Sequence, residues 1–262
     1  MGRVIAIANQ KGGVGKSTTA INLSASVAAL DHYCLMIDMD PQANATSGIG
    51  LKDQTGDRPS VYDCLVHGLP LWETYLPTEL TYLKVVPSSR NLVGAEVELV
   101  GMNGHEFRLR ELLSPVRDLH DYIFIDCPPS LGLLTLNALV AADGIVVPIQ
   151  AEYFSLEGVS ELMNTIRFIQ TKLNPTVALE GVLLTMFDDR TNLARQIRAD
   201  IEGYFQDKLF TTVIPRNVRL GEAPSFGRPV LLYDINSRGA QSYLALAREF
   251  VNHEETGAGK RA

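Results

Sequence analysis

The sequence predicts a single α/β domain built on a mostly parallel, twisted β-sheet with helices on both faces. Three observations predict this fold class: short apolar runs, helical patterns between most of them, and no linker rich in Pro, Ser or Gly that would divide the chain. Strands that alternate with helices imply right-handed crossovers and a sheet buried on both sides. We expect one domain over residues 1–251 and a polar, disordered tail over residues 252–262.

Apolar runs of five to seven residues are the predicted strands, and their continuous apolar character is typical of parallel strands buried on both faces. In chain order they are VIAIAN (4–9), YCLMID (33–38), LKVVP (83–87), YIFID (122–126), IVVPIQ (145–150), GVLLTMF (181–187) and TTVIP (211–215). Ligands of such folds bind at the carboxyl ends of the strands. Residues that directly follow a strand are therefore the first candidates for a functional site.

Apolar residues recur with helical spacing between these runs. The predicted helices are Ser17–Leu30, Phe107–Leu113, Leu131–Ala141, Ser155–Leu173, Leu193–Phe205 and Gly239–Val251. With 262 residues, of which 46% are hydrophobic, the chain is long enough to bury the whole sheet.

Composition argues against several classes of protein. No apolar stretch approaches the roughly 20 residues of a membrane-spanning helix, and the first strand begins without a leader pattern, so we expect a cytoplasmic protein. Cys34, Cys64 and Cys127 have no metal-ligand spacing and are expected to be buried thiols. The net charge of −7 argues against a protein that coats nucleic acid.

The negative charge is unevenly distributed along the chain. Residues 1–180 carry 12 basic and 20 acidic side chains, whereas residues 181–262 carry 11 basic and 10 acidic ones. Any site for a polyanion is therefore expected in the C-terminal third.

The first predicted strand leads directly into a glycine-rich turn with the sequence KGGVGKST (11–18). Glycines in a strand-to-helix turn let backbone N–H groups converge on phosphate oxygens, and the helix N-terminus adds partial positive charge. The expected cradle is Gly12, Gly13, Val14 and Gly15, with Lys16 on the β- and γ-phosphates and the Ser17 hydroxyl on Mg²⁺. The P-loop pattern GxxxxGK[ST] would place Gly at position 10, but this chain has Gln10 there and an additional lysine, Lys11.

Two further strand ends supply carboxylates. Asp38 and Asp40 close the second predicted strand, where alternate side chains point to one side. The run YIFID ends at Asp126, and four apolar residues followed by Asp form the Walker B arrangement that holds Mg²⁺. An apolar run that ends in Asp is a weak signal by itself, and its position downstream of a P-loop is what favours the metal-binding interpretation.

Four segments together resemble one family. They are KGGVGKST (11–18), DMDPQANATSGIG (38–50), FIDCPPSLGLLTLNAL (124–139) and VIPRNVRLGEAPSFGRPVLLYDINSRGAQSYLALA (213–247). The chain resembles the ParA/Soj ATPases of bacterial chromosome and plasmid partition, within the deviant-Walker-A group of P-loop NTPases that also contains MinD. KGGVGK is shared by the whole group, whereas DPQ-x-NAT and IPRNVRL-x-EAPS are typical of the chromosomal branch.

The resemblance implies a role for each matching residue. Lys11 would be the signature lysine that reaches, across a nucleotide-sandwich dimer, to the phosphates of the other subunit. Lys16, Ser17 and Thr18 would bind phosphate and Mg²⁺ in their own subunit, and Asp40 would orient the attacking water. Asp38 and Asp126 would lie around the metal ion. Pro215 and Asn217 would line the adenine.

The resemblance also implies the function and the partners. The expected protein is a slow ATPase that uses ATP and Mg²⁺, forms a homodimer with ATP, binds double-stranded DNA without sequence preference, and is stimulated by a ParB-like protein. It would be cytoplasmic and associated with the nucleoid, without a membrane partner. Arg190 and Arg219 match the arginines of the family's DNA surface, and Arg195, Arg198 and Arg216 lie near them in sequence.

Two alternatives remain open at this stage. A relative that positions a non-chromosomal cargo would use the same DNA-bound dimer, so the motifs separate it poorly from a partition protein. A synthetase of the same fold would use ATP to activate a small molecule, and it would need no Lys11 acting on a second subunit.

Overall fold

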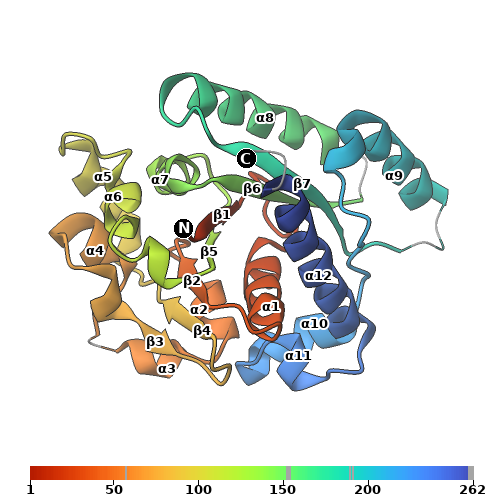
Figure 1. Ribbon diagram of the computed structural model, residues 1–262, viewed down its shortest axis with the longest axis horizontal. Coiled ribbons are helices and arrows are strands. Elements are labelled where there is room, and N and C mark those ends of the chain that lie inside the picture. The colour runs from red at the N-terminus through yellow and green to blue at the C-terminus, as the bar shows by residue number, and fades with distance from the viewer. Residues whose placement is uncertain (57, 152–154, 189, 191, 259–262) are drawn as a thin grey trace.

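The computed structural model describes residues 1–262 except positions 57, 152–154, 189, 191 and 259–262 (Figure 1). Its strands form one seven-stranded sheet in the order β3-β4-β2-β5-β1-β6-β7. The strands are β1 (Arg3–Ile7), β2 (Cys34–Asp38), β3 (Leu76–Pro77), β4 (Leu83–Val86), β5 (Tyr122–Asp126), β6 (Gly144–Gln150) and β7 (Ala178–Thr185). All neighbouring pairs are parallel except β3 with β4. The predicted mostly parallel sheet is confirmed.

Helices cover both faces of this sheet (Figure 1). The α-helices are α1 (Lys16–Ala28), α2 (Asn44–Gly48), α3 (Lys52–Thr55), α4 (Val61–His67), α5 (Leu92–Val100), α6 (Arg108–Leu113), α7 (Leu133–Ala141), α8 (Ser155–Lys172), α9 (Asn192–Phe205), α10 (Val218–Glu222), α11 (Val230–Tyr233) and α12 (Arg238–Ala258). Four 3₁₀ turns join them: η1 (Leu71–Thr74), η2 (Arg117–Leu119), η3 (Gln206–Lys208) and η4 (Ala223–Phe226).

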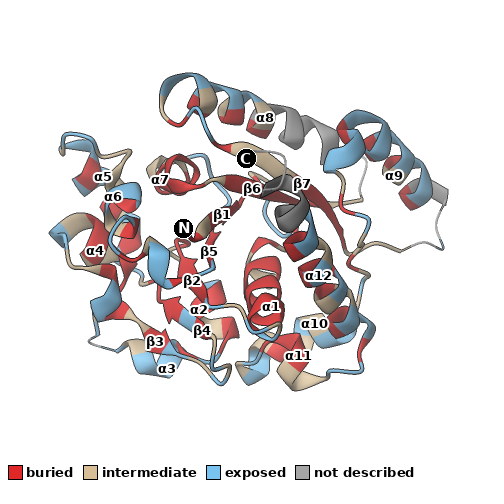
Figure 2. Ribbon diagram, viewed as in Figure 1, coloured by how far each residue is buried: buried red, intermediate tan, exposed pale blue. Residues whose placement is uncertain are grey.

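The alternation of side chains along each strand divides the core into two layers. Val4 and Ala6 of β1 belong to a buried cluster with residues of α4 to α9, whereas Ile5 and Ile7 belong to a second cluster with residues of α1, α11 and α12. Figure 2 shows buried residues along the strands and on the inner sides of the helices. A strand buried on both faces must be apolar at every position, which explains the continuous runs in the sequence.

One predicted strand is wrong. Residues 211–215 run beside β7 but form a single isolated bridge, between Pro215 and Phe187. The Thr211 and Thr212 amides donate to the Glu249 carboxylate at 2.6 and 2.9 Å instead of joining a ladder. Pro215 has no amide hydrogen to donate. The segment therefore closes the sheet edge as an extended loop that leads into α10.

The C-terminal helix is longer than predicted. It begins at Arg238 and continues to Ala258, so the predicted disordered tail does not start at residue 252, and positions 259–262 of that tail lie outside the described residues. Within the described chain, none of the helices combines the length and the apolar character that crossing a bilayer requires.

Candidate functional site

The glycine-rich turn lies at the carboxyl end of β1 and leads into α1. Gly13 and Gly15 have positive φ angles of 74° and 88°, a conformation that favours glycine. Helix α1 begins at Lys16, with no side-chain cap at Gly15 and no acidic residue in its first turn. Its first N–H groups are thus available to an anion, and the helix dipole favours negative charge there.

Contacts with neighbouring strands hold this turn in place. The Asn9 side chain donates to the Pro148 carbonyl at 2.7 Å and accepts from the Lys11 amide at 3.0 Å. The Thr185 hydroxyl at the end of β7 donates to the Val14 carbonyl at 2.8 Å. The ends of β6 and β7 therefore hold the cradle in place.

The Lys16 ammonium folds back over the cradle and donates to the Lys11 carbonyl at 3.0 Å. Burial lowers the pKa of Lys16, and the nearby Asp126, Cys127 and Asp40 oppose that shift. A partly desolvated cation interacts more strongly with phosphate than one in water.

Asp38 organises the loop after β2. It is fully buried, and its oxygens accept hydrogen bonds from the Thr46 amide (2.8 Å), the Thr46 hydroxyl (2.7 Å) and the Asp40 amide (3.1 Å). Burial raises the pKa of Asp38 to about 6, against the effect of these hydrogen bonds. The carboxylate thereby fixes the start of α2 and the position of Asp40.

Asp126 differs from Asp38 because its fully buried carboxylate accepts no hydrogen bond of normal geometry from the described residues, although the Ser17 side chain lies close enough to lower its pKa. Burial raises the pKa of Asp126 well above its ordinary range, and the nearby Asp38 adds to the shift. A buried carboxylate of this kind beside a phosphate cradle fits a cation site. The described residues contain no cluster of three or more His, Cys, Asp or Glu that could hold a metal, so phosphate and water would have to complete the shell.

A pocket of about 360 Å³ brings several predicted residues together. It is lined by Gly12, Gly13, Gly15, Lys16, Ser17, Thr18, Asp40, Gln42, Asn44, Pro129 and Met186. The P-loop cradle thus faces Asp40 and the loop that follows Asp126. We call this the phosphate pocket.

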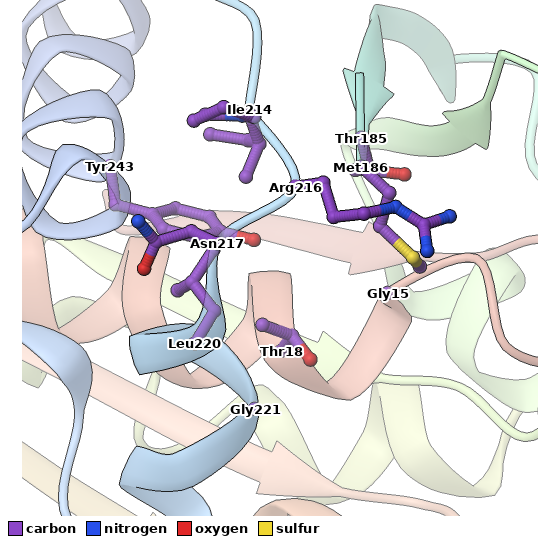
Figure 3. A pocket seen from close by; sticks show the side chains of 11 residues that line it. Gly15, Thr18, Thr185, Met186, Ile214, Arg216, Asn217, Leu220, Gly221 and Tyr243 are labelled. Atoms are coloured by element: carbon purple, nitrogen blue, oxygen red, sulfur yellow. The ribbon is translucent and has the colours of Figure 1, made fainter. Parts of the chain in front are cut away.

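A second, mostly apolar pocket of about 220 Å³ adjoins the first (Figure 3). Its lining is Gly15, Thr18, Thr185, Met186, Ile214, Pro215, Arg216, Asn217, Leu220, Gly221 and Tyr243. Gly15, Thr18 and Met186 line both pockets, so the two lie side by side. This apolar pocket has the walls that a planar base requires, and it contains both predicted adenine residues, Pro215 and Asn217.

Helix packing supplies the floor of the apolar pocket. Tyr243 of α12 is buried, and its hydroxyl lies 3.1 Å from the Thr19 hydroxyl of α1. Asn217 caps α10 by accepting from the Arg219 amide at 3.0 Å, and like Tyr243 it lines the pocket (Figure 3). Sequence reasoning missed Tyr243, because only the packing of α12 against α1 brings it here. Thr185, the last residue of β7, and Met186, the next residue, could have been found by reading each strand end.

A third pocket, of about 500 Å³, lies on the other side of the 213–216 segment, and we call it the arginine pocket. Its lining is Phe187, Asp188, Arg190, Arg198, Val213, Pro215, Arg216, Arg238 and Ser242. Pro215 and Arg216 line both this pocket and the apolar pocket. The sequence pointed to three of its four arginines and missed Arg238, which is far away in sequence at the start of α12.

The other two predicted arginines lie outside the arginine pocket. Arg219 is half exposed on α10, where its guanidinium forms ion pairs with Glu222 at 2.7 Å and Asp234 at 3.2 Å. Arg195 is exposed on α9. Arg190 itself pairs with Asp188 at 2.6 Å, and Arg198 with Glu202 at 2.7 Å.

The fold and the site together define a P-loop nucleotide-binding protein with an additional lysine at the start of its loop. The family model for an AAA domain matches residues 2–179. The chain is 54% identical over 254 residues to the chromosome partitioning protein ParA of Myxococcus xanthus, covering 97% of this chain and 89% of that one. It is 52% identical over 249 residues to the sporulation initiation inhibitor protein Soj of Bacillus subtilis, covering 95% and 98%. The chain belongs to the ParA/Soj family of chromosome-partitioning P-loop ATPases.

A solved structure supports the same fold. The cobyrinic acid a,c-diamide synthase of Mycobacterium smegmatis, determined with ADP and magnesium, superposes with a TM-score of 0.84 at 32% identity, covering 98% of this chain and 97% of that one. The predicted fold class and the family resemblance are therefore confirmed.

Proposed function

We propose that this chain is an ATP-dependent switch that dimerises on ATP, binds DNA without sequence preference and is reset by slow, partner-stimulated hydrolysis. The adjacency of the phosphate pocket and the apolar pocket, which share Gly15, Thr18 and Met186, carries the proposal, because a nucleoside triphosphate needs a polar cradle next to an apolar slot. One solved structure of the related synthase contains ADP and magnesium, and a second structure of the same synthase contains an ATP analogue and magnesium.

Within one subunit, Lys16 and the P-loop amides bind the phosphates, and the Ser17 and Thr18 hydroxyls lie at the same pocket. Ser17 and Asp126 would hold Mg²⁺, which neutralises phosphate charge when it is bound. Because the Asp38 oxygens are already occupied by Thr46 and Asp40, we assign to Asp38 the positioning of the loop and not metal contact. Asp40, which lines the phosphate pocket, orients the attacking water.

Lys11 acts on the second subunit. In the described chain Lys11 does not line its own phosphate pocket, and its carbonyl holds Lys16. A lysine that reaches the partner's phosphates places positive charge where it develops during hydrolysis. ATP, and not ADP, would therefore favour the dimer.

The arginine pocket is the proposed centre of the DNA surface. Four guanidinium groups from the 187–190 loop, α9, the 213–216 segment and α12 meet around it, and Asp188 is the acidic residue among its lining. Arginine contacts to phosphates position a duplex without reading its bases. Arg219 and Arg195 lie outside this pocket and would extend the surface to either side. Because Arg216 also borders the apolar pocket, nucleotide and DNA share one wall.

Hydrolysis assays test this function. The purified chain alone should turn over ATP far below the median enzyme rate of about 10 per second. Random duplex DNA together with the ParB-like protein of the same genome should stimulate it. Fast turnover without either would favour the synthetase alternative. Stimulation by a different DNA-bound protein, with none by the ParB-like one, would favour a relative that positions another cargo.

A further inference from the structure

The carboxylate of Glu96 reaches from α5 to the start of α7 (Figure 1). Its Oε1 atom accepts a hydrogen bond from the amide of Leu134, the second residue of α7, at 3.4 Å. The same carboxylate lies against Gly132, so close that a Cβ atom there would overlap with it. Glu96 can therefore occupy this place only because residue 132 is a glycine.

Helix α7 needs an acceptor at this end. Its first N–H groups have no partner within the helix, because the hydrogen bonds of a helix start one turn later. Its N-cap residue is Gly132, which has no side chain, and its first turn contains no acidic residue. The Glu96 carboxylate supplies both an acceptor and a negative charge, which the dipole of α7 favours. Glu96 thus caps α7 from a neighbouring helix.

The residues between β5 and α7, 127–132, form part of the wall of the phosphate pocket, which Pro129 lines. We call them the β5–α7 segment. At its start, the Cys127 amide donates to the Ile7 carbonyl of β1 at 3.2 Å. Its other end lies against the Glu96 carboxylate. The position of Pro129 is therefore set from both ends of the segment.

Helix α5 is a firm support for this contact. Its inner face is fully buried in the core through Leu92, Ala95 and Leu99. The loop before α5 also holds the segment that contains Asp40, because the Ser88 hydroxyl donates to the Asp40 carbonyl at 2.6 Å. Helix α5 is thus connected to two sides of the phosphate pocket, to Asp40 through Ser88 and to Pro129 through Glu96.

We propose that Glu96 is a positioning residue for ATP hydrolysis, and that its carboxylate holds the β5–α7 segment in place beside the phosphates. Among the described residues, Glu96 is not part of the lining of the phosphate pocket, so it acts through Gly132 and Leu134 and does not touch ATP. A displacement of about 1 Å in such a pocket can slow a reaction on the order of 100-fold. This inference rests on the proposed function, because it concerns the same reaction at the same pocket.

The loop that binds the triphosphate is held separately. It follows β1, and its printed supports are the Asn9 side chain, which accepts from the Lys11 amide, and the Thr185 hydroxyl, which donates to the Val14 carbonyl. Loss of the Glu96 carboxylate should therefore change the rate constant of hydrolysis much more than the affinity for ATP. A residue that only stabilised the fold would leave both quantities unchanged in the folded protein.

Single-turnover hydrolysis of ATP by the full-length chain, with the Kd of a non-hydrolysable ATP analogue from calorimetry, tests this difference. E96A should lower the rate constant at least about tenfold and change the Kd less than about threefold. E96Q should recover part of the rate, because its amide oxygen can still accept from Leu134. E98A is the matched control on the same helix and should behave as the parent, because the Glu98 carboxylate accepts from the Tyr62 hydroxyl of α4 at 3.1 Å.

Gly132 offers a second probe from the other side of the contact. Its φ of −74° suits alanine, and the atoms nearest to a Cβ placed there all belong to the Glu96 carboxylate. G132A should therefore displace this carboxylate without another clash, and it should slow hydrolysis as E96A does. In E96A/G132A the Cβ meets no carboxylate, so the double variant should be no slower than E96A alone.

Each outcome decides a different point. Parent-like hydrolysis by E96A would overturn the positioning role alone, and so would losses in E96A and G132A that multiply in the double variant. An equal loss of rate and affinity in E96A would show that Glu96 supports the cradle itself, which also overturns the inference. If E96A did not fold, a parent-like rate in G132A would overturn it. A parent that hydrolyses no ATP would overturn the proposed function and this inference together.

Discussion

Asp126 and Asp38 lie opposite each other on the neighbouring strands β5 and β2, and neither exposes any surface. In the described structure three hydrogen bonds occupy the Asp38 oxygens, whereas the Asp126 oxygens have only the Ser17 side chain nearby. The Asp126 carboxylate is therefore available to bind a cation, whereas the Asp38 carboxylate holds the loop that carries Asp40.

This difference predicts the behaviour of D126N. The pKa of Asp126 is raised in the folded chain. The free energy of unfolding therefore falls as the pH rises above about 4, the pKa of an Asp side chain in the unfolded chain, by about 1.4 kcal/mol for each pH unit. Without nucleotide, D126N should therefore melt at least about 2–4 °C above the parent at pH 7.5. It should also lose the strengthening of ATP binding by Mg²⁺. The exposed D118N is the control, and a variant less stable than the parent with normal Mg²⁺ dependence would contradict the assignment.

The apolar pocket predicts a selective loss of nucleotide binding in L220W. An indole at Leu220 should fill much of the pocket of about 220 Å³ and exclude a base, while the phosphate pocket stays open. ATP affinity should fall at least tenfold, whereas tripolyphosphate should bind as in the parent, as measured by calorimetry. V218W is the matched control on the same helix, because Val218 is 74% exposed. An equal loss for both ligands would show that the variant had disturbed the cradle itself.

Arg238 tests the arginine pocket. With ATP present, R238Q should weaken binding to random duplex and make the slope of log K against log salt shallower by about 0.9 for each phosphate that Arg238 neutralises. R248Q is the control, because Arg248 is exposed on the same helix outside the pocket. R219Q is a better probe of α10 than a charge reversal, which would place a third carboxylate beside Glu222 and Asp234. Identical salt slopes for R238Q and the parent would remove the pocket from the DNA surface.

His120 supplies a pH dependence that is independent of the nucleotide site. Burial, with the nearby Lys84, lowers the pKa of His120 to about 4, and its Nε2 atom lies 3.1 Å from the Tyr75 hydroxyl. The pKa of His120 in the folded chain lies below its value of about 6.5 in the unfolded chain. The contribution of the neutral His120 ring to the free energy of unfolding is therefore fully present above about pH 6.5 and is lost as the pH falls toward 4. His120 is buried, so the loss over this range should be on the order of 1–3 kcal/mol.

Urea unfolding of H120Q between pH 7 and pH 4.5 checks this expectation. The variant should lose less stability than the parent over that range, while H67Q, at an exposed histidine, should follow the parent. If the free energy of unfolding of H120Q and of the parent fell equally between pH 7 and pH 4.5, the lowered pKa of His120 would be contradicted.

Sequence reasoning reached the sheet, most of the large helices and the phosphate loop because these features are local. A strand buried on both faces must be continuously apolar, and a phosphate turn needs glycine at Gly13 and Gly15, where φ is positive. The strand predicted at 211–215 failed because Glu249, more than 30 residues away, takes the amides that a ladder would use. Tyr243 and Arg238 were missed for the same reason: only the packing of α12 brings them to the pockets.

Helix α5 was missed for a different reason. Its apolar residues occupy both faces, so the helical period is blurred and no local signal separates Leu92 and Leu99 from the exposed Val93, Val97 and Val100. The hydrogen-bond partners that Asp38 has, and that Asp126 lacks among the described residues, also required the structure, because both follow from where α2 folds relative to β5.

We expect ATP to close two subunits through Lys11. Sedimentation equilibrium of D40A measures it most directly, because slowed hydrolysis should preserve the ATP state while the dimer forms. D40A should be a dimer with ATP and Mg²⁺ and a monomer with ADP. K11A/D40A should stay monomeric with ATP while still binding it, and K16A should lose tight ATP binding. A D40A chain that remains monomeric with saturating ATP and Mg²⁺, or a K11A/D40A chain that dimerises as well as D40A, would contradict the account.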